Sequence, residues 1–139
     1  KESVVSALIH ELLRKDSVYF QEKITAITSF PANQRVPYII QLGLEIYSTQ
    51  KELRQKIQGI YQYLVDQGEF KKVIQYYTDT MSQYIVIKES GRDPKVKARL
   101  TVNSFLGLME QVVMENPDFI KDEKMVTEIK RMFLHYLCE

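Results

Sequence analysis

The chain has a single cysteine, no tryptophan, and only 5 glycines and 4 prolines among its 139 residues. One thiol, Cys138, cannot form a disulfide within the chain, and this usage fits a reducing compartment. No run of about 18 apolar residues is present, so no membrane-spanning helix is expected. The first residues also lack the basic-then-apolar pattern of a secretory signal. We therefore expect a cytoplasmic protein.

Motifs for catalysis and for metal binding are missing as well. His10-Glu11 begins like the zinc-protease pattern, but Arg14 occupies the place of the second imidazole that such a zinc site needs. The chain has no glycine-rich phosphate loop and no Glu-x-x-His pair of the kind that di-iron bundles use. Ser48 to Lys51 match S-x-x-K, but a helix cap explains these residues better. We expect no enzymatic activity, no metal and no cofactor.

A charge excess of one sign is also lacking, since 19 basic residues face 18 acidic ones, for a net charge of +1. A nucleic-acid-binding domain usually shows a strong basic excess, so this segment by itself is not expected to hold DNA. With 45% hydrophobic and 27% charged residues, the composition is ordinary for a globular protein. A chain of this length can bury about 68–70% of the surface that its unfolded form exposes. Residues 1–139 are therefore interpreted as one domain.

Apolar residues recur at spacings of three and four through most of the chain, which is the pattern of amphipathic helices. The first run predicts a long helix over residues 2–28, although Asp16-Ser17 could instead cap a second helix there. Pro37 suits the first turn of a helix that ends near Ser48. No segment alternates polar and apolar residues between turn signals. We therefore predict an all-α fold of six or seven helices.

The residues that follow Ser48 carry helix start and stop signals. Thr49 to Glu52 fit a capping box, in which the Thr49 hydroxyl accepts from a backbone amide of the new helix and Glu52 reaches back. Gly68 suits the left-handed residue that ends this helix. The next helix is predicted over residues 69–89.

Two further helices are predicted after residue 90. Asp93-Pro94 supplies an N-cap and a proline for the first turn, and Asn116-Pro117 ends the helix that starts there. Either Asp118 or Asp122 starts the last helix. The two predicted helices span residues 94–115 and 122–138.

The helix predicted over residues 94–115 is apolar on more than one side. Its apolar residues are Ala98, Leu100, Val102, Phe105, Leu106, Leu108, Met109, Val112, Val113 and Met114. In a chain this polar, such a helix must bury one side in its own core and the other against a partner, most simply a second copy. Gly107 is unfavourable inside a helix, which suggests a close helix crossing, either within the domain or at a dimer contact. Lys95, Lys97 and Arg99 are interpreted as a solvated cluster.

Tyrosine and methionine are frequent, with 9 and 5 residues respectively. They gather at Tyr61 and Tyr63 on one predicted helix and at Tyr76, Tyr77, Met81 and Tyr84 on the next. Tyrosine combines a large apolar face with one hydroxyl, and methionine adapts to cavities of irregular shape. These residues suit a pocket for an apolar or aromatic small molecule, or else a core in which the tyrosine hydroxyls reach solvent at its rim.

The order of the helices, the opening KESVVSALI and the later DPKVKARL and FLGLMEQ resemble the C-terminal domain of a TetR-family transcriptional regulator. The resemblance covers nearly the whole chain. In that family a three-helix DNA-binding head ends in a short aromatic-rich stretch and a lysine-acid pair, from which a long connecting helix leaves. Lys1-Glu2 looks like that pair. The resemblance therefore implies that residues 1–28 form the connecting helix and that the helix-turn-helix head is absent from this sequence.

The same resemblance implies an effector-sensing, dimerising domain of a bacterial regulator such as a repressor. A small molecule would move the first helix, and residues 94–138 of two copies would form a four-helix bundle. Facing apolar positions, and no family motif, suggest as ligand-binding residues Tyr19, Tyr61, Tyr77, Met81, Tyr84, Phe105 and Met109. The predicted homodimer contacts are Leu106, Gly107, Glu110, Val113, Met114, Ile129, Met132, Phe133 and Tyr136.

The alternative function is a helical protein–protein interaction adaptor without a small-molecule site. Its apolar helix would dock onto a different protein. A core without a cavity of about 300 Å³ or more would favour this alternative.

Overall fold

The computed structural model describes residues 2–58, 67–85 and 93–138. These residues form six α-helices and two short 3₁₀ helices, and no β-strand occurs among them, which confirms the all-α prediction for this part of the chain. The elements in chain order are α1 (Glu2–Ile24), η1 (Thr25–Ser29), α2 (Ala32–Ser48), α3 (Lys51–Gln58), α5 (Gln67–Tyr84), α6 (Pro94–Glu115), η2 (Pro117–Lys121) and α7 (Glu123–Cys138).

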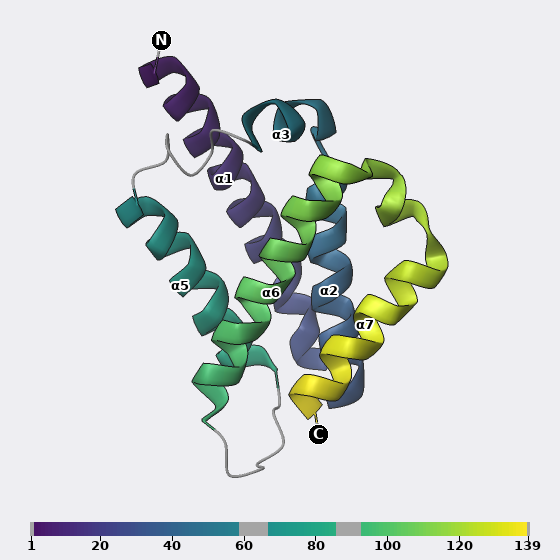
Figure 1. Ribbon diagram of the computed structural model, residues 1–139. Helices are drawn as coiled ribbons and strands as arrows, with labels where there is room; N and C mark the ends of the chain where they lie inside the picture. The colour runs from purple at the N-terminus through teal and green to yellow at the C-terminus, as the bar shows by residue number, and fades with distance from the viewer. Residues whose placement is uncertain (1, 59–66, 86–92, 139) are drawn as a thin grey trace.

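The helices pack around α2 and α6 (Figure 1). Helix α5 lies along α6 on one side, while α7 lies along α2 on the other and also touches α6. Helix α1 packs against α2, and α3 contacts α6. One core joins α1, α2, α5, α6 and α7 and includes Ile27, Leu44, Met109 and Leu137, all nearly or completely buried. A second, smaller cluster of Ile9 and Leu12, with Leu53 packed against it, joins the first half of α1 to α3.

The first helix is continuous through Asp16-Ser17, so the alternative of a second cap at that point is wrong. The α-helix ends at Ile24, and η1 continues the predicted element to residue 29. Side-chain hydroxyls of Thr25, Thr28 and Ser29 each donate to the carbonyl three residues earlier. Since the last four carbonyls of a helix lack partners within the helix, these bonds accompany the tighter 3₁₀ turn.

Pro37 lies inside α2 and not in its first turn as predicted, because α2 begins at Ala32. A proline inside a helix removes one backbone hydrogen bond, but its fixed φ is compatible with helix. The earlier start includes Val36, which is completely buried. Core burial of this turn offsets the missing bond.

Thr49 does not form the predicted capping box, although α3 begins close to the expected place, at Lys51. The Thr49 hydroxyl donates to the carbonyl of Ile46 at 2.7 Å and so closes α2. Gln50 has a positive φ of 49°, and its carbonyl accepts the first backbone bond of α3 from Arg54. A left-handed residue at this position is a common way to end a helix.

Gly68 lies within α5, which begins at Gln67, so Gly68 does not end the preceding helix as predicted. Residues 59–66 and 86–92 lie outside the described ranges. The predicted ends of the helices in those ranges are therefore not tested.

The start and end of α6 agree with the capping prediction. Asp93 accepts a hydrogen bond from the backbone amide of Lys95 at 2.9 Å, and Pro94 occupies the first turn. The helix ends at Glu115, and the Asn116 side chain then caps η2. Of the two predicted starts for the last helix, Asp122 is correct, since its side chain accepts from the amide of Lys124 at 3.0 Å.

The prediction that Lys97 belongs to a solvated cluster is wrong. Only 3% of the Lys97 surface is exposed. Its Nζ donates to the carbonyl oxygen of Tyr136 at 3.0 Å and lies 5.4 Å from the centre of the Tyr136 ring. A cation is favourable beside the carbonyls that end a helix, here α7. Lys95 and Arg99 are exposed as expected.

Candidate functional site

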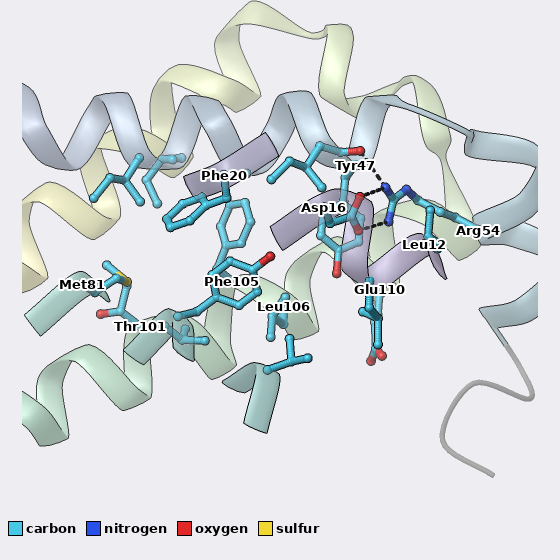
Figure 2. A pocket seen from close by; sticks show the side chains of 18 residues that line it. Leu12, Asp16, Phe20, Tyr47, Arg54, Met81, Thr101, Phe105, Leu106 and Glu110 are labelled. Atoms are coloured by element: carbon cyan, nitrogen blue, oxygen red, sulfur yellow. Dashed lines mark hydrogen bonds and ion pairs between the residues drawn. The ribbon is translucent and has the colours of Figure 1, made fainter. Parts of the chain in front are cut away.

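A cavity of about 140 Å³ lies among α1, α2, α3, α5 and α6. Figure 2 shows its wall, with apolar and aromatic side chains along most of its length and charged side chains at one end. The volume is about half of the roughly 300 Å³ at which drug-sized pockets begin. The lining residues are Leu12, Leu13, Asp16, Phe20, Ile39, Ile40, Gly43, Ile46, Tyr47, Arg54, Val73, Tyr77, Met81, Thr101, Val102, Phe105, Leu106 and Glu110.

Helix α1 contributes four of these residues from one face. Leu12, Asp16 and Phe20 follow one another at spacings of four, and Leu13 lies beside them. Residues four apart lie one above the other on a helix, so they present a continuous stripe to the cavity. The first helix therefore lines the cavity over more than two turns.

Gly43 determines where the Phe105 ring lies. A Cβ added to Gly43 would be 2.5 Å from two atoms of that ring, so the ring packs directly against the backbone of α2. The ring also meets Tyr47 and Phe133, with ring centres 6.5 Å and 6.0 Å away. Because only glycine leaves this room, Gly43 sets the position of one wall of the cavity.

An ion pair between Asp16 and Arg54 closes the polar end of the cavity. The guanidinium donates to both carboxylate oxygens, at 3.0 and 2.8 Å, and the two side chains are only 13% and 8% exposed. Arg54 also donates to the carbonyls of Thr49 and Ile46 at 2.9 and 3.0 Å. Burial raises the pKa of Asp16, and Arg54 opposes this shift. The pair joins α1 to α3 and to the end of α2.

Tyr77 of α5 lies beside this ion pair. Burial of its hydroxyl raises the pKa of Tyr77 to about 12. The Phe20 ring meets the Tyr77 ring edge-on, with centres 5.1 Å apart. Tyr77 therefore offers the cavity a ring and a hydroxyl that stays protonated at physiological pH.

Glu110 of α6 also lines the cavity. Figure 2 shows its carboxylate pointing away from Arg54. Among the described residues, none donates a hydrogen bond to it or forms an ion pair with it. Glu110 is partly exposed, and a molecule that approached its carboxylate would displace no described partner.

Three of the predicted ligand-binding residues border the cavity, namely Tyr77, Met81 and Phe105. The other predicted positions that the structure describes lie elsewhere: the hydroxyl of Tyr19 donates to Glu45 at 2.9 Å, Met109 is fully buried in the core, and Tyr84 packs on its edge. Tyr61 lies outside the described residues.

Sequence reasoning missed the polar end of the cavity. Asp16 lies within an apolar helical pattern, which is unusual for a charged residue, and this was the one available signal. Its partner Arg54 is 38 positions away and gave no signal.

The predicted dimer residues separate into buried and exposed sets. Ile129 and Phe133 are buried in the core of their own chain, while Leu106 and Glu110 face the cavity and Tyr136 is partly buried. Gly107 and Met132 are exposed. The side chains of Val113 and Met114 are outside the described set. The interface itself stays a prediction.

One flank of α6 is open in the single chain. Val96 and Leu100 are 55% and 50% exposed, and no described atom lies within 4 Å of a Cβ placed on Gly107. The opposite flank carries the buried residues Ala98 and Val102. No described helix therefore crosses α6 closely at Gly107, which leaves the dimer contact as the remaining predicted use of this glycine.

No group of three or more His, Cys, Asp or Glu residues that could hold a metal ion occurs among the described residues. Glu11, from the zinc-like motif, instead pairs with Arg14 at 2.7 Å on the surface. No described helix is both long and apolar enough to cross a bilayer. Comparisons of the chain with protein-family models, with curated proteins and with solved structures find no match.

Proposed function

We propose that this chain is the effector-sensing and dimerising domain of a TetR-like bacterial transcriptional regulator, whose DNA-binding head is absent from this sequence. One observation carries the proposal: the first helix, which would lead to the head, supplies Leu12, Leu13, Asp16 and Phe20 to the wall of the cavity. A molecule in the cavity contacts that helix directly. The cavity and the head are then connected by one rigid element.

The Asp16–Arg54 pair extends this connection from α1 to α3 and the end of α2. A bound molecule can change the position of α1 only as far as it binds one arrangement of these helices more tightly than another. To raise the population of one arrangement from one tenth to nine tenths, the molecule must bind that arrangement about 80-fold more tightly than the other. The ligand would thereby alter the spacing of two heads in a dimer.

The homodimer in this proposal uses the open flank of α6 together with the exposed part of α7. Val96, Leu100 and Gly107 lie on this flank, and Met132 is 53% exposed on α7. A stable dimer of standard size buries about 1,600 Å² in total. A second copy would cover these apolar side chains, and the absence of a side chain at Gly107 would let its helix approach closely.

Charged substitutions on this surface test the dimer. We expect Leu100→Glu combined with Met132→Glu to convert the dimer to a monomer, because two carboxylates would be buried without partners at the interface. The measurement is sedimentation equilibrium at micromolar concentration. Val18→Glu is the matched control, since Val18 is 41% exposed on α1 and away from this surface. A monomeric unsubstituted protein, or a double variant that still dimerises, contradicts the proposed interface.

A DNA-binding experiment tests the proposal that this chain belongs to a transcriptional regulator. We expect the full-length protein, with its head, to retard operator DNA on a gel, and we expect residues 1–139 alone not to, since their net charge of +1 offers no basic surface. Retardation by this domain alone would contradict the assignment of DNA binding to the absent head.

Native mass spectrometry of the purified domain shows whether a small molecule is retained.

The volume of the cavity favours the second candidate function, a helical adaptor without a small-molecule site. At about 140 Å³ the cavity is too small for a drug-sized ligand. An adaptor predicts that no ring-sized compound binds saturably in the cavity. A sensor predicts that at least one does, so ligand titration separates the two.

A further inference from the structure

We propose that the cavity selects a compact aromatic cation, meaning one ring that carries a protonated amine or a quaternary ammonium group, over neutral and anionic molecules of the same shape. This inference rests on the proposed function, since it names the class of effector. It follows from the size of the cavity, from the charges on its wall and from its aromatic rings.

The size limits the ligand to about one ring. An apolar cavity of about 150 Å³ engineered into another protein stays dry and binds benzene, and the cavity here has about the same volume. Larger fused-ring molecules would require the helices to separate. Selectivity among molecules with one ring must then come from the contacts between the wall and the substituent on that ring.

The described residues of the wall carry one more negative charge than positive charge. Its charged residues are the carboxylates of Asp16 and Glu110 and the guanidinium of Arg54, so two negative charges and one positive charge leave a formal charge of −1. Arg54 is committed to Asp16 and to two backbone carbonyls. No described residue pairs with Glu110. A monocation restores neutrality at the wall, whereas an anion would have to break the Asp16–Arg54 pair to find a positive partner.

Four aromatic side chains strengthen the same preference: Phe20, Tyr47, Tyr77 and Phe105. The faces of such rings attract cations within about 6 Å, and this attraction grows where water is excluded. Arg54 already lies 5.1 Å from the centre of the Tyr47 ring, and the other aromatic residues of the wall are Phe20, Tyr77 and Phe105. Rings and carboxylate together favour a charged head next to Glu110 and an aromatic body among the apolar side chains.

Three probes of similar shape and different charge test the inference, namely benzylamine, benzyl alcohol and benzoate. Each is titrated at neutral pH into the domain while amide chemical shifts are recorded by NMR, which gives both the location and the dissociation constant. We expect benzylamine to bind about tenfold more tightly than benzyl alcohol, which is the scale of one cation–π contact with partial ion pairing. Benzoate is expected to bind most weakly. The shifts should concentrate at amides of the cavity wall.

Glu110→Gln then identifies the charge responsible, because glutamine keeps the shape and removes the carboxylate. We expect this variant to reduce the preference for benzylamine over benzyl alcohol to about twofold or less, because the affinity for benzylamine falls. Glu115→Gln is the matched control, since Glu115 is exposed on the same helix and does not line the cavity. It should leave every affinity unchanged.

The outcomes separate this inference from the proposed function. If benzyl alcohol or benzoate binds at least as tightly as benzylamine, or if the preference survives in Glu110→Gln, the charge selectivity is overturned while the sensor function stands. If none of the probes shifts an amide of the cavity wall, both the selectivity and the sensor function are overturned, and the adaptor is favoured. Selective binding of benzylamine that Glu110→Gln abolishes supports both.

Discussion

Arg35 and Arg54 lie near the two ends of α2, and both fasten neighbouring helices through backbone carbonyls. Arg35 donates to the carbonyls of Phe30, Tyr84 and Thr28 at 3.1, 3.0 and 3.3 Å. Arg54 donates to the carbonyls of Ile46 and Thr49 and, in addition, to both oxygens of a carboxylate. The first arginine is only half-buried, and the second is 8% exposed.

The difference shows what burial demands of a charge. A half-buried guanidinium keeps part of its hydration, so the partial negative charges of carbonyls at helix ends suffice as partners. A guanidinium removed from water needs a full countercharge, because an unpaired buried ion is very unfavourable. The end with Arg35 therefore only ties helices together. The end with Arg54 places a carboxylate on the wall of a cavity, where it can also affect a ligand.

The largest expected effect comes from removing the countercharge. Asp16→Asn leaves Arg54 buried without an ionic partner, so we expect a loss of about 3–5 kcal/mol in the free energy of unfolding. Urea denaturation measures it. The double variant Asp16→Leu with Arg54→Met should recover most of this loss, since both charges are gone. The exposed pair of Arg14 and Glu11 is the control: Glu11→Gln should produce no measurable change. A single variant as stable as the unsubstituted protein would show that Arg54 does not need its countercharge.

Arg35→Met is expected to have a smaller effect, a loss of about 1.5–3 kcal/mol in the same measurement, which is the range for hydrogen bonds to a charged group. No carboxylate partner is left behind, and the half-exposed site lets water reach the carbonyls of Phe30 and Thr28. The contrast between the two arginines fails if Arg35→Met is as damaging as Asp16→Asn.

The smallest effect is a dependence of stability on pH at the Arg54 end. Because the folded pKa of Tyr77 is raised to about 12 above an ordinary value near 10, its contribution is complete below about pH 10 and is lost as the pH rises through 12. By pH 11 the loss is on the order of 1 kcal/mol. Tyr77→Phe should lack this part of the alkaline decline. The measurement is the unfolding free energy of both proteins at about pH 9 and pH 11. Parallel curves for the two proteins would rule out Tyr77 as the source.

Helix boundaries were predictable where a side chain caps its own helix. Asp93-Pro94 and Asp122 are examples, because the caps depend on residues two or three positions apart. Thr49 shows the limit of the same reasoning. Its local pattern fits an N-cap, but its hydroxyl instead bonds the carbonyl of Ile46 and contacts the Arg54 guanidinium. A distant ion pair competes with the local cap, and no window of sequence contains both.

The candidate site was predictable in kind but not in detail. Aromatic and methionine side chains on facing helices suggested a pocket, and Tyr77, Met81 and Phe105 do line one. The cavity also depends on Gly43, whose missing side chain admits the Phe105 ring from 62 positions further along the chain. The burial of Lys97 likewise depends on a residue remote in sequence, because Lys97 donates to the carbonyl of Tyr136 at the end of α7. Such pairings require the crossing geometry of helices that are remote in sequence.

The sequence alone determined that the chain is helical, where most of its helices begin, and that α6 has apolar residues on two flanks, because propensity, capping and periodicity act within a few residues. Only the tertiary structure decided which flank of α6 is buried, that Asp16 meets Arg54, and that a ring-sized space with a net negative wall remains between five helices. Each of these depends on how helices cross, and a crossing depends on side chains from several segments packing at once.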